Sequence, residues 1–535
     1  MNGLLRLIQD PGGPLFKMKP HSSLTENPFT AAELHFAAEL GWLCGSAAAA
    51  LPHSELEEHM QRSGLELYRK LLQGHLDLRA QRELATAPRN VNGTDGVTRT
   101  HKRATSRTLA TLFGPVTVKR LGYSAPGWPR LHPADVALQL PRQRYSHPLQ
   151  RRVAEAVAGA AYVQVVDRIA ATTASVVPKR QAEQLVQAAA VDFEAFYSQH
   201  PAPSAGDDEL LVLSFDGKGV PMRRIDLRPA TARAAQHRRF KLTKRLSRGE
   251  KRGFKRMAEV ATVYTIAPFV RTPADIVHDL WPAEPPRPLP SRPRPQHKRV
   301  WASLQRSPAE VITAAFNEAQ RRDPEHRCRW VVLVDGQIHQ LDLIQAELAR
   351  RGLKVPLVLD VIHVLGYLWK AAWVFHPQGS TDAQDWVSHR LWRILQGRAR
   401  VVAAEMRSQA TRLGLEVAKR KPVDKCADYL HHNAAYLDYP TALTAGMPIA
   451  TGVIEGACRY LIKDRLEITG ARWRLTGAEA VLQLRALVTS GDFDAYWQFH
   501  LRQEFLRNHA AHYLPTPPPM PIPKPEKEPE LARIA

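Results

Sequence analysis

Cysteine is scarce in this chain of 535 residues, and the four cysteines lie far apart. They form no C-x-x-C pair, which argues against a disulfide framework and against a zinc ribbon or finger. Apolar runs near 18 residues, the length that crosses a membrane, are also missing. Residues 1–19 scatter charges among glycine and proline, unlike a signal peptide. These absences predict a soluble protein of a reducing cytoplasm, with no membrane partner.

Acidic residues are too few to balance the basic ones, so the net charge is +22 and the pI is about 10.0. The segment from Lys218 to Arg256 holds 15 Lys and Arg against Asp226 and Glu250, which gives it a net charge of +13 (15 − 2). Such a surface gains affinity for a polyanion by releasing counterions from phosphates. A general preference for arginine throughout the chain is the alternative explanation.

The N-terminal part reads as a largely helical region, residues 1–108, with helices starting near Thr30 and Ser54. In a second region, residues 109–200, a switch to period two around Gly114-Pro115 predicts a β-hairpin. Three short helices follow, and a break at 172–175 is consistent with a helix-turn-helix in which Lys179 and Arg180 open the DNA-reading helix. A structural three-helix bundle explains this pattern almost as well.

Residues 201–363 differ in kind, because near-continuous apolar runs alternate with helical patterns. We expect strands at 210–217, 257–268, 330–336 and 355–360, covered on both faces in a mixed α/β core. A capping-box pattern at Ser307-Pro308-Ala309-Glu310 begins one helix, and a second helix, 339–352, ends in glycine. The remaining chain divides into a helical insertion, residues 364–448, further helices at 449–513, and a proline-rich tail expected to be disordered, 514–535.

The insertion is rich in tryptophan and arginine. Such side chains can stack on an unpaired base near a cleaved DNA end, although tryptophans at this spacing also fill cores. The residues concerned are Trp369, Trp373, Trp386, Trp392, Arg390, Arg393, Arg398 and Arg400.

Two aspartates follow apolar runs and precede glycine, which lets the backbone approach a ligand. Asp216 ends the first core strand and Asp335 a later one, and ligand sites lie beyond the carboxyl ends of such strands. Carboxylates on neighbouring strands, roughly 5 Å apart, can share Mg²⁺. Two such ions activate an attacking hydroxyl and stabilise the leaving oxygen in phosphoryl transfer. Glu455 is the natural third ligand, with Arg459 and Lys463 at four-residue spacing on one helix face; an ordinary ion pair also explains that spacing.

Four sequence blocks resemble, in order, those of insertion-sequence transposases of the ISKra-four family, which is similar to the ISL-three and Mutator-like groups. They are SFDGKGV, VLVDGQ, DVIHVLGYLW and GVIEGACRYLIKDRLEITGARW, and LFGPVTVKRLGY and PKRQAEQLV also look like that family. The resemblance implies an RNase H-like catalytic core with an aspartate, aspartate, glutamate (DDE) triad and a helical insertion before the glutamate. It also implies cleavage and joining of DNA at terminal inverted repeats, a target DNA, and at least a dimer on DNA. The zinc-binding cysteine cluster common in related groups is absent here.

A second candidate for the middle acid is Asp360, in a D-x-x-H element with His363. In an RNase H-like sheet the Asp360 strand lies one place further out, roughly 10 Å from the Asp216 strand, or twice the inter-strand spacing. We therefore expect Asp216, Asp335 and Glu455 to hold two Mg²⁺ ions, for which Mn²⁺ can substitute. His363 could orient a ligand or be structural. The activity expected is that of a DDE transposase; a nuclease or resolvase without joining activity and a catalytically dead DNA-binding regulator are the alternatives.

The predicted DNA contacts come from the helix-turn-helix, the basic segment and the Glu455 helix. They are Lys179, Arg180, Arg238, Arg239, Lys244, Arg245, Arg459, Lys463 and Arg472. Such binding would place the protein on the bacterial nucleoid.

Neutralising Arg238, Arg239, Lys244 and Arg245 together should weaken binding to all DNA sequences about equally. Each lost phosphate contact lowers the slope of log K against log salt by about 0.9, so four lower it by at most roughly 3.6. Salt titrations with an end duplex and a scrambled duplex measure this slope. Lost discrimination with an unchanged slope would mean that the segment reads bases.

Overall fold

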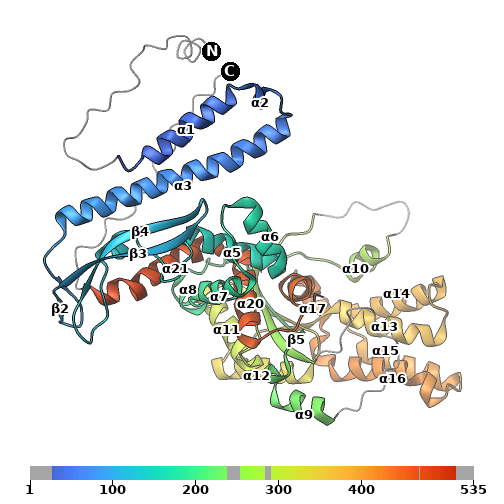
Figure 1. Ribbon diagram of the computed structural model, residues 1–535. Helices are drawn as coiled ribbons and strands as arrows, with labels where there is room; N and C mark the ends of the chain where they lie inside the picture. Colours follow the sequence, from blue (N-terminus) through green and yellow to red (C-terminus); the bar gives the residue numbers. More distant parts are fainter. Residues whose placement is uncertain (1–26, 238–253, 283–290, 469, 514–535) are drawn as a thin grey trace. The chain divides into compact units, whose positions relative to one another are not determined.

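The computed structural model describes residues 27–237, 254–282, 291–468 and 470–513 of a mixed α/β protein (Figure 1). Contacts divide the chain into two compact units. Unit 1 comprises Met1–Arg144, Thr173–Ser175 and His512–Ala535; unit 2 comprises Tyr145–Thr172 and Val176–Ala511. Within the described ranges, no helix combines the length and apolar character needed to span a membrane.

Unit 1 contains a pair of helices and a long β-hairpin. Its elements are α1 (Thr30–Leu43), α2 (Ser46–Ala49), α3 (His53–Thr86), β1 (Val91–Asn92), β2 (Thr98–Arg99), β3 (His101–Thr111), β4 (Gly114–Ser124) and α4 (Pro133–Ala137). Leu76 of α3 packs against Leu109, Val116 and Val118 of the hairpin, so a small apolar core joins the long helix to the strands.

The hairpin predicted from the sequence is confirmed, but its position was wrong in two respects. Its turn is Leu112-Phe113, because Thr111 pairs with Gly114, whose φ of +110° suits glycine. Its first strand also reaches back to His101, into the region expected to be helical. The outer part of β3 is polar and exposed, so it lacks the alternation that marks a half-buried strand.

Unit 2 is built on a five-stranded mixed sheet in the order β7-β6-β5-β8-β9. The central strand β5 pairs antiparallel with β6 and parallel with β8, while β6–β7 is antiparallel and β8–β9 parallel. The strands are β5 (Leu210–Pro221), β6 (Lys255–Ile266), β7 (Gln296–Ser303), β8 (Arg329–Val334) and β9 (Leu357–Leu359). The expected mixed α/β core is confirmed; β7 was missed.

Helices pack on this sheet at the places that position the acids. α11 (Pro308–Arg322) packs on β5 and β6, and the capping box predicted at Ser307 and Glu310 is confirmed. α12 (Ile338–Arg351) ends at Gly352 with φ +67°, also as predicted. Further helices of this part are η2 (Arg224–Asp226), α9 (Pro229–His237) and α10 (Pro273–Leu280).

The segment after β9 is helical, as expected, up to the Glu455 region. It comprises α13 (Val361–Phe375), α14 (Thr381–Leu395), α15 (Ala399–Arg412), α16 (Val417–His432), η3 (Ala434–Tyr436) and α17 (Tyr439–Thr444). The Glu455 region and the C-terminal helices follow: α18 (Gly452–Ala457), η4 (Cys458–Lys463), α19 (Asp464–Leu466), α20 (Leu475–Ser490), α21 (Phe493–Asn508) and η5 (Ala510–His512).

The three short helices predicted before the core form a packed group. α5 (His147–Gly159), α6 (Tyr162–Thr172) and α7 (Lys179–Ala189) contact one another, α5 and α7 also contact α20, and α8 (Phe193–Gln199) packs on α21. Lys179 and Arg180 lie exposed in the first turn of α7. Both a helix-turn-helix and a structural bundle remain compatible with this packing.

A buried carboxylate fastens the edge strand β7 to α11. Glu318, 2% exposed, pairs with Arg299 of β7 at 2.5 Å, with Arg321 at 2.6 Å and with Arg322 at 2.8 Å. Burial acts to raise the pKa of Glu318, but the arginines outweigh it and lower the pKa to about 2. The charged carboxylate therefore stabilises the folded state.

We expect Glu318→Gln to lower the free energy of unfolding by about 3–5 kcal/mol, because it leaves buried cations without their counter-ion. The difference in the free energy of unfolding between the wild type and Glu318→Gln should be complete above pH 4.5. It should disappear as the pH falls toward about 2, since folding lowers the pKa of Glu318. Thermal melts against pH measure it. The control is Glu325→Gln, which removes an exposed ion pair with Arg327. It should lower the free energy of unfolding by no more than about 1 kcal/mol. Equal losses would contradict a stabilising role for Glu318.

Candidate metal centre

The strand register aligns three aspartates in one row across the parallel half of the sheet. Paired residues of β5 and β8 differ in number by 119, as Ser214 and Leu333 do. The same difference separates Asp216 from Asp335. In the β8–β9 pair the offset is 25, as between Val334 and Leu359, and it also separates Asp335 from Asp360. Continued beyond β8 and β9, the register makes Asp335 the middle member, one strand spacing of about 4.8 Å from each neighbour.

The prediction that Asp216 ends its strand was wrong: Asp216 lies within β5, which continues to Pro221 because the antiparallel partner β6 still pairs with it. One carboxylate oxygen accepts a hydrogen bond from the backbone N–H of Gly217 at 2.6 Å, and the other accepts one from the Cys458 thiol at 3.0 Å. Burial and the charge of Asp216 raise the pKa of Cys458, so the thiol keeps its proton and remains a donor. This contact joins the first strand to the segment that carries Glu455.

Asp335 follows β8 directly, at a sharp turn. Its Oδ1 accepts from the backbone N–H of Gln337 at 2.8 Å, and its backbone carbonyl accepts from the Tyr429 hydroxyl at 2.8 Å. Gly336 has φ +86°, and a Cβ there would meet the Tyr429 ring at 3.0 Å and Asn433 at 3.1 Å. Glycine is therefore required beside Asp335, and α16 holds the turn in place.

Asp360 is fully buried at the N-terminus of α13. Its carboxylate accepts from the backbone N–H groups of Ile362, His363 and Thr451 at 3.0–3.2 Å, and it lies 2.6 Å from Nδ1 of His363. Burial acts to raise the pKa of Asp360, but these hydrogen bonds outweigh it and lower the pKa. The bond with Asp360 in turn raises the pKa of His363.

Glu455 lies in the first turn of α18, and its pKa is raised by partial burial and then by the negative charges of Asp216 and Asp360. The prediction of one regular α-helix here was wrong, since α18 passes into a π-helix, η4, at Cys458. Its wider turn changes the spacing that was to bring Glu455, Arg459 and Lys463 onto one face, and π-turns are frequent at functional sites.

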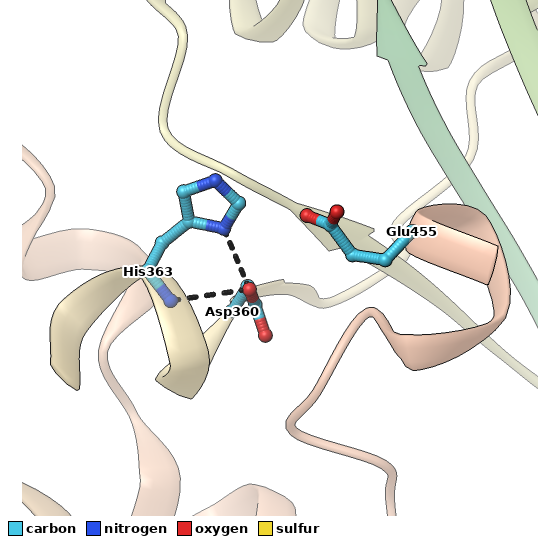
Figure 2. Close-up of side chains that lie close together, drawn as sticks. All are labelled: Asp360, His363 and Glu455. Carbon is cyan, nitrogen blue, oxygen red and sulfur yellow. Dashed lines mark hydrogen bonds and ion pairs between the residues drawn. The ribbon is translucent and has the colours of Figure 1, made fainter. Parts of the chain in front are cut away.

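One group of ligand atoms in the described part of the chain is tight enough to hold an ion. Atoms of Asp360, His363 and Glu455 all lie within 4.8 Å of one another, and Figure 2 shows Glu455 directed toward the Asp360–His363 pair. Asp216 and Asp335 do not belong to that group. The predicted triad is thus neighbouring in register, yet its side chains are not gathered around a single point.

A pocket of about 240 Å³ lies beside the aspartate row and is lined by Asp216, Asp335 and Glu259, among others. Glu259, on β6 opposite Gly217, was missed from the sequence; burial and then the charge of Asp216 raise its pKa. Cys458 was missed as well. An acid inside an otherwise apolar strand was the available signal for Glu259, whereas no local pattern marks Cys458.

Some of the basic residues predicted to contact DNA are exposed, and others lie outside the described residues. Arg459, Lys463 and Arg472 are exposed, with Arg459 only 3.8 Å from Asp464. Arg238, Arg239, Lys244 and Arg245 lie outside the described residues. In the insertion, Trp386 is buried and therefore fills the core, whereas Trp373 and Trp392 remain 44% and 39% exposed.

Comparison with protein-family models gives no match, and no curated protein is significantly similar.

Glu455→Gln tests whether this cluster awaits a cation. In EDTA its melting temperature should equal or exceed that of the wild type, because one of several mutually repelling charges is gone. The rise in melting temperature caused by Mg²⁺ or Mn²⁺ in the wild type should be lost, because a ligand is missing. Asp464→Asn, an exposed acid after the π-helix, is the matched control and should keep that rise. A full metal response in Glu455→Gln would remove Glu455 from the site.

Proposed function

We propose that the protein is a DDE transposase of an insertion sequence, similar to the ISKra-four family, that cleaves and joins DNA by phosphoryl transfer. The observation that carries the proposal is the row of acids on neighbouring parallel strands, with Glu455 on a helix against it. The sheet order β7-β6-β5-β8-β9, with its first three strands antiparallel, supports an RNase H-like core. A helical insertion between β9 and the Glu455 helix agrees with the same architecture.

The residues suit two divalent ions. Asp216, Asp335 and Glu455 would hold them, and carboxylate oxygens are the ligands that Mg²⁺ takes. Bound there, the ions would supply a polarised attacking oxygen and a stabilised leaving oxygen. The chain's own part is to orient: Cys458 and Gly217 fix the Asp216 carboxylate, and Gly336 with Tyr429 fixes the backbone at Asp335.

Asp335 is the better candidate than Asp360 for the middle ligand. The oxygens of Asp360 already accept three backbone N–H groups and contact His363, and the side chain is fully buried. The carboxylate of Asp335 accepts one hydrogen bond, from Gln337, and lines the pocket. Asp360 is therefore assigned the role of positioning His363 and the loop before Glu455.

DNA is the proposed partner, with terminal inverted repeats and a target duplex as substrates. Net charge +22 and the exposed Lys179, Arg180, Lys463 and Arg472 support it. A nuclease that hydrolyses without joining would share this site, and a DNA-binding regulator would lack its activity. Short inverted repeats flanking the coding region, and joined products in vitro, distinguish a transposase from both.

Substitution of the aspartates tests the mechanism. Asp216→Asn should keep DNA binding in a gel shift and lose nicking of an end-containing duplex in Mg²⁺, because a metal ligand is lost while phosphate contacts remain. Asp335→Asn should be equally inactive, whereas Asp360→Asn should keep residual activity that Mn²⁺ partly restores.

Asp342→Asn, an exposed acid on α12, is the control and should cleave normally. Unchanged cleavage by Asp216→Asn would remove Asp216 from the site. An inactive Asp360→Asn beside an active Asp335→Asn would reverse the assignment of the middle ligand.

A further inference from the structure

The long hairpin of unit 1 leaves one of its two strands uncovered along the outer edge. Side chains of α3 cap the edge of β4, where Gln73 accepts from the backbone N–H of Thr117 at 2.8 Å. Glu83 does the same for the backbone N–H of Leu121 at 3.0 Å. In the described chain no further strand pairs with β3. Six of the eight residues 101–108 are exposed, so this half of β3 is available to a ligand outside the fold.

Positive charge is concentrated in the hairpin. Residues 98–124 contain six Lys and Arg and no acid. Four of the six have partners inside unit 1: Arg99 pairs with Asp95, Lys119 with Asp77 and Arg120 with Asp135, and Arg107 donates to the carbonyls of Pro141 and Gln143. The other two are Lys102 and Arg103, both exposed on β3, and neither pairs with an acid of the described chain.

A third cation joins them because a glycine leaves room for it. Arg103 pairs with Gly122 across the hairpin, and paired residues direct their side chains to the same face. A Cβ at Gly122 would meet Cδ of Arg130 at 2.6 Å. The exposed Arg130 side chain therefore lies over Gly122, beside Arg103. We call Lys102, Arg103 and Arg130 the hairpin patch.

The turn that carries Arg130 is fastened to the hairpin. Leu131 pairs with Tyr123 of β4, and the guanidinium of Arg99 donates to the carbonyl of Pro129 at 3.1 Å. Arg99 is itself buried, so the anchor is part of the folded unit. Arg130 is thus placed by the fold at the open end of the hairpin.

A neighbouring histidine responds to the positive charge at this end of unit 1. Burial lowers the pKa of His132 to about 4, and the charges of nearby arginines add to this effect. Those arginines are Arg120, Arg130 and Arg107. A surface that disfavours a further cation favours an anion.

Charges on an edge strand also discourage pairing between molecules, which by itself would explain Lys102 and Arg103. It does not explain Arg130, because a turn outside the two strands brings this side chain over Gly122. Phosphate groups account for all three cations, since Lys and Arg side chains, hydroxyls and backbone N–H groups are the donors that contact the DNA backbone.

The aromatic side chains at this end favour a duplex over a single strand. Surfaces for single strands stack successive bases on several rings. Here Trp128 is 48% exposed, but Tyr123 is only 1% exposed. The donors of the patch and of β3 therefore suit a sugar–phosphate backbone whose bases are paired.

We propose that the hairpin patch, together with the open edge of β3, binds the phosphate backbone of duplex DNA. Lys102, Arg103 and Arg130 contact phosphate oxygens, and the exposed hydroxyls of Ser106 and Thr108 extend the contact along the strand. Residues 101–108 span about 27 Å, which is long enough to follow several phosphates. The surface reads no bases. The inference rests on the proposed function in taking DNA as the partner, and it assigns unit 1 a part in holding it.

Hydrogen exchange of the full-length wild type locates the contact. Adding an end-containing duplex in EDTA, where no cleavage occurs, should slow amide exchange in residues 101–108 and 125–130. Residues 53–66 of α3 should exchange at an unchanged rate and are the internal control. Protection by DNA that spares the hairpin would overturn the proposal.

Salt titrations of Arg103→Gln with Arg130→Gln test the charges. Binding to an end duplex and to a scrambled duplex should weaken equally, and the slope of log K against log salt should fall by at most about 1.8, for two lost phosphate contacts. Arg62→Gln with Arg82→Gln removes two exposed arginines of α3 and the same charge, and should keep the wild-type slope. An unchanged slope in the patch variant, or an equal fall in the control, would contradict the proposal.

The outcomes separate this inference from the transposase proposal, because all binding is measured in EDTA. A patch variant with wild-type DNA binding and normal cleavage in Mg²⁺ rejects the hairpin surface alone. A wild type that protects its hairpin on DNA but never cleaves an end duplex rejects the transposase alone. A wild type that binds no duplex rejects both.

Discussion

Repulsion among carboxylates that the sheet register forces together is the constraint on which the site depends. Asp216, Asp335 and Asp360 occupy one row across three neighbouring strands, with Glu455 brought against them from a helix. Two unit charges about 5 Å apart cost about 3 kcal/mol at an effective dielectric constant of 20. Partial burial, and after it the negative charges of Asp216 and Asp360, raise the pKa of Glu455.

The surrounding structure relieves the repulsion unequally, and this inequality separates the roles of the acids. Hydrogen bonds from backbone N–H groups and His363 stabilise the charged carboxylate of Asp360, which is fully buried. Asp216 is oriented by one thiol and one N–H group. The carboxylate of Asp335 accepts one hydrogen bond, from Gln337, and Glu455 lies exposed on the helix beside the row. Cys458, the first residue of η4, donates to Asp216, so the π-helix begins at a residue that contacts the acid row.

The sequence predicted those features that a short stretch of chain decides by itself. The strands that lead to Asp216 and Asp335, the capping box at Ser307 and the glycine end of α12 each have a local physical cause, and each is confirmed. Features decided by distant contacts were missed. The polar first half of β7 forms a strand because β6 pairs with it, and Cys458 reaches Asp216 across 242 residues of sequence. The π-helix after Glu455 likewise replaces a segment whose pattern favours a regular helix.

The central claim is that this crowding of acids serves divalent ions held between Asp216, within β5, and Asp335, at the end of β8. Crystals grown with Mn²⁺ would locate the ions directly by anomalous scattering. Our account predicts density in contact with Asp216 and Asp335, with Glu455 completing the coordination and Asp360 keeping its bond to His363. A lone ion held by Asp360, His363 and Glu455, with Asp216 and Asp335 unliganded, would contradict it.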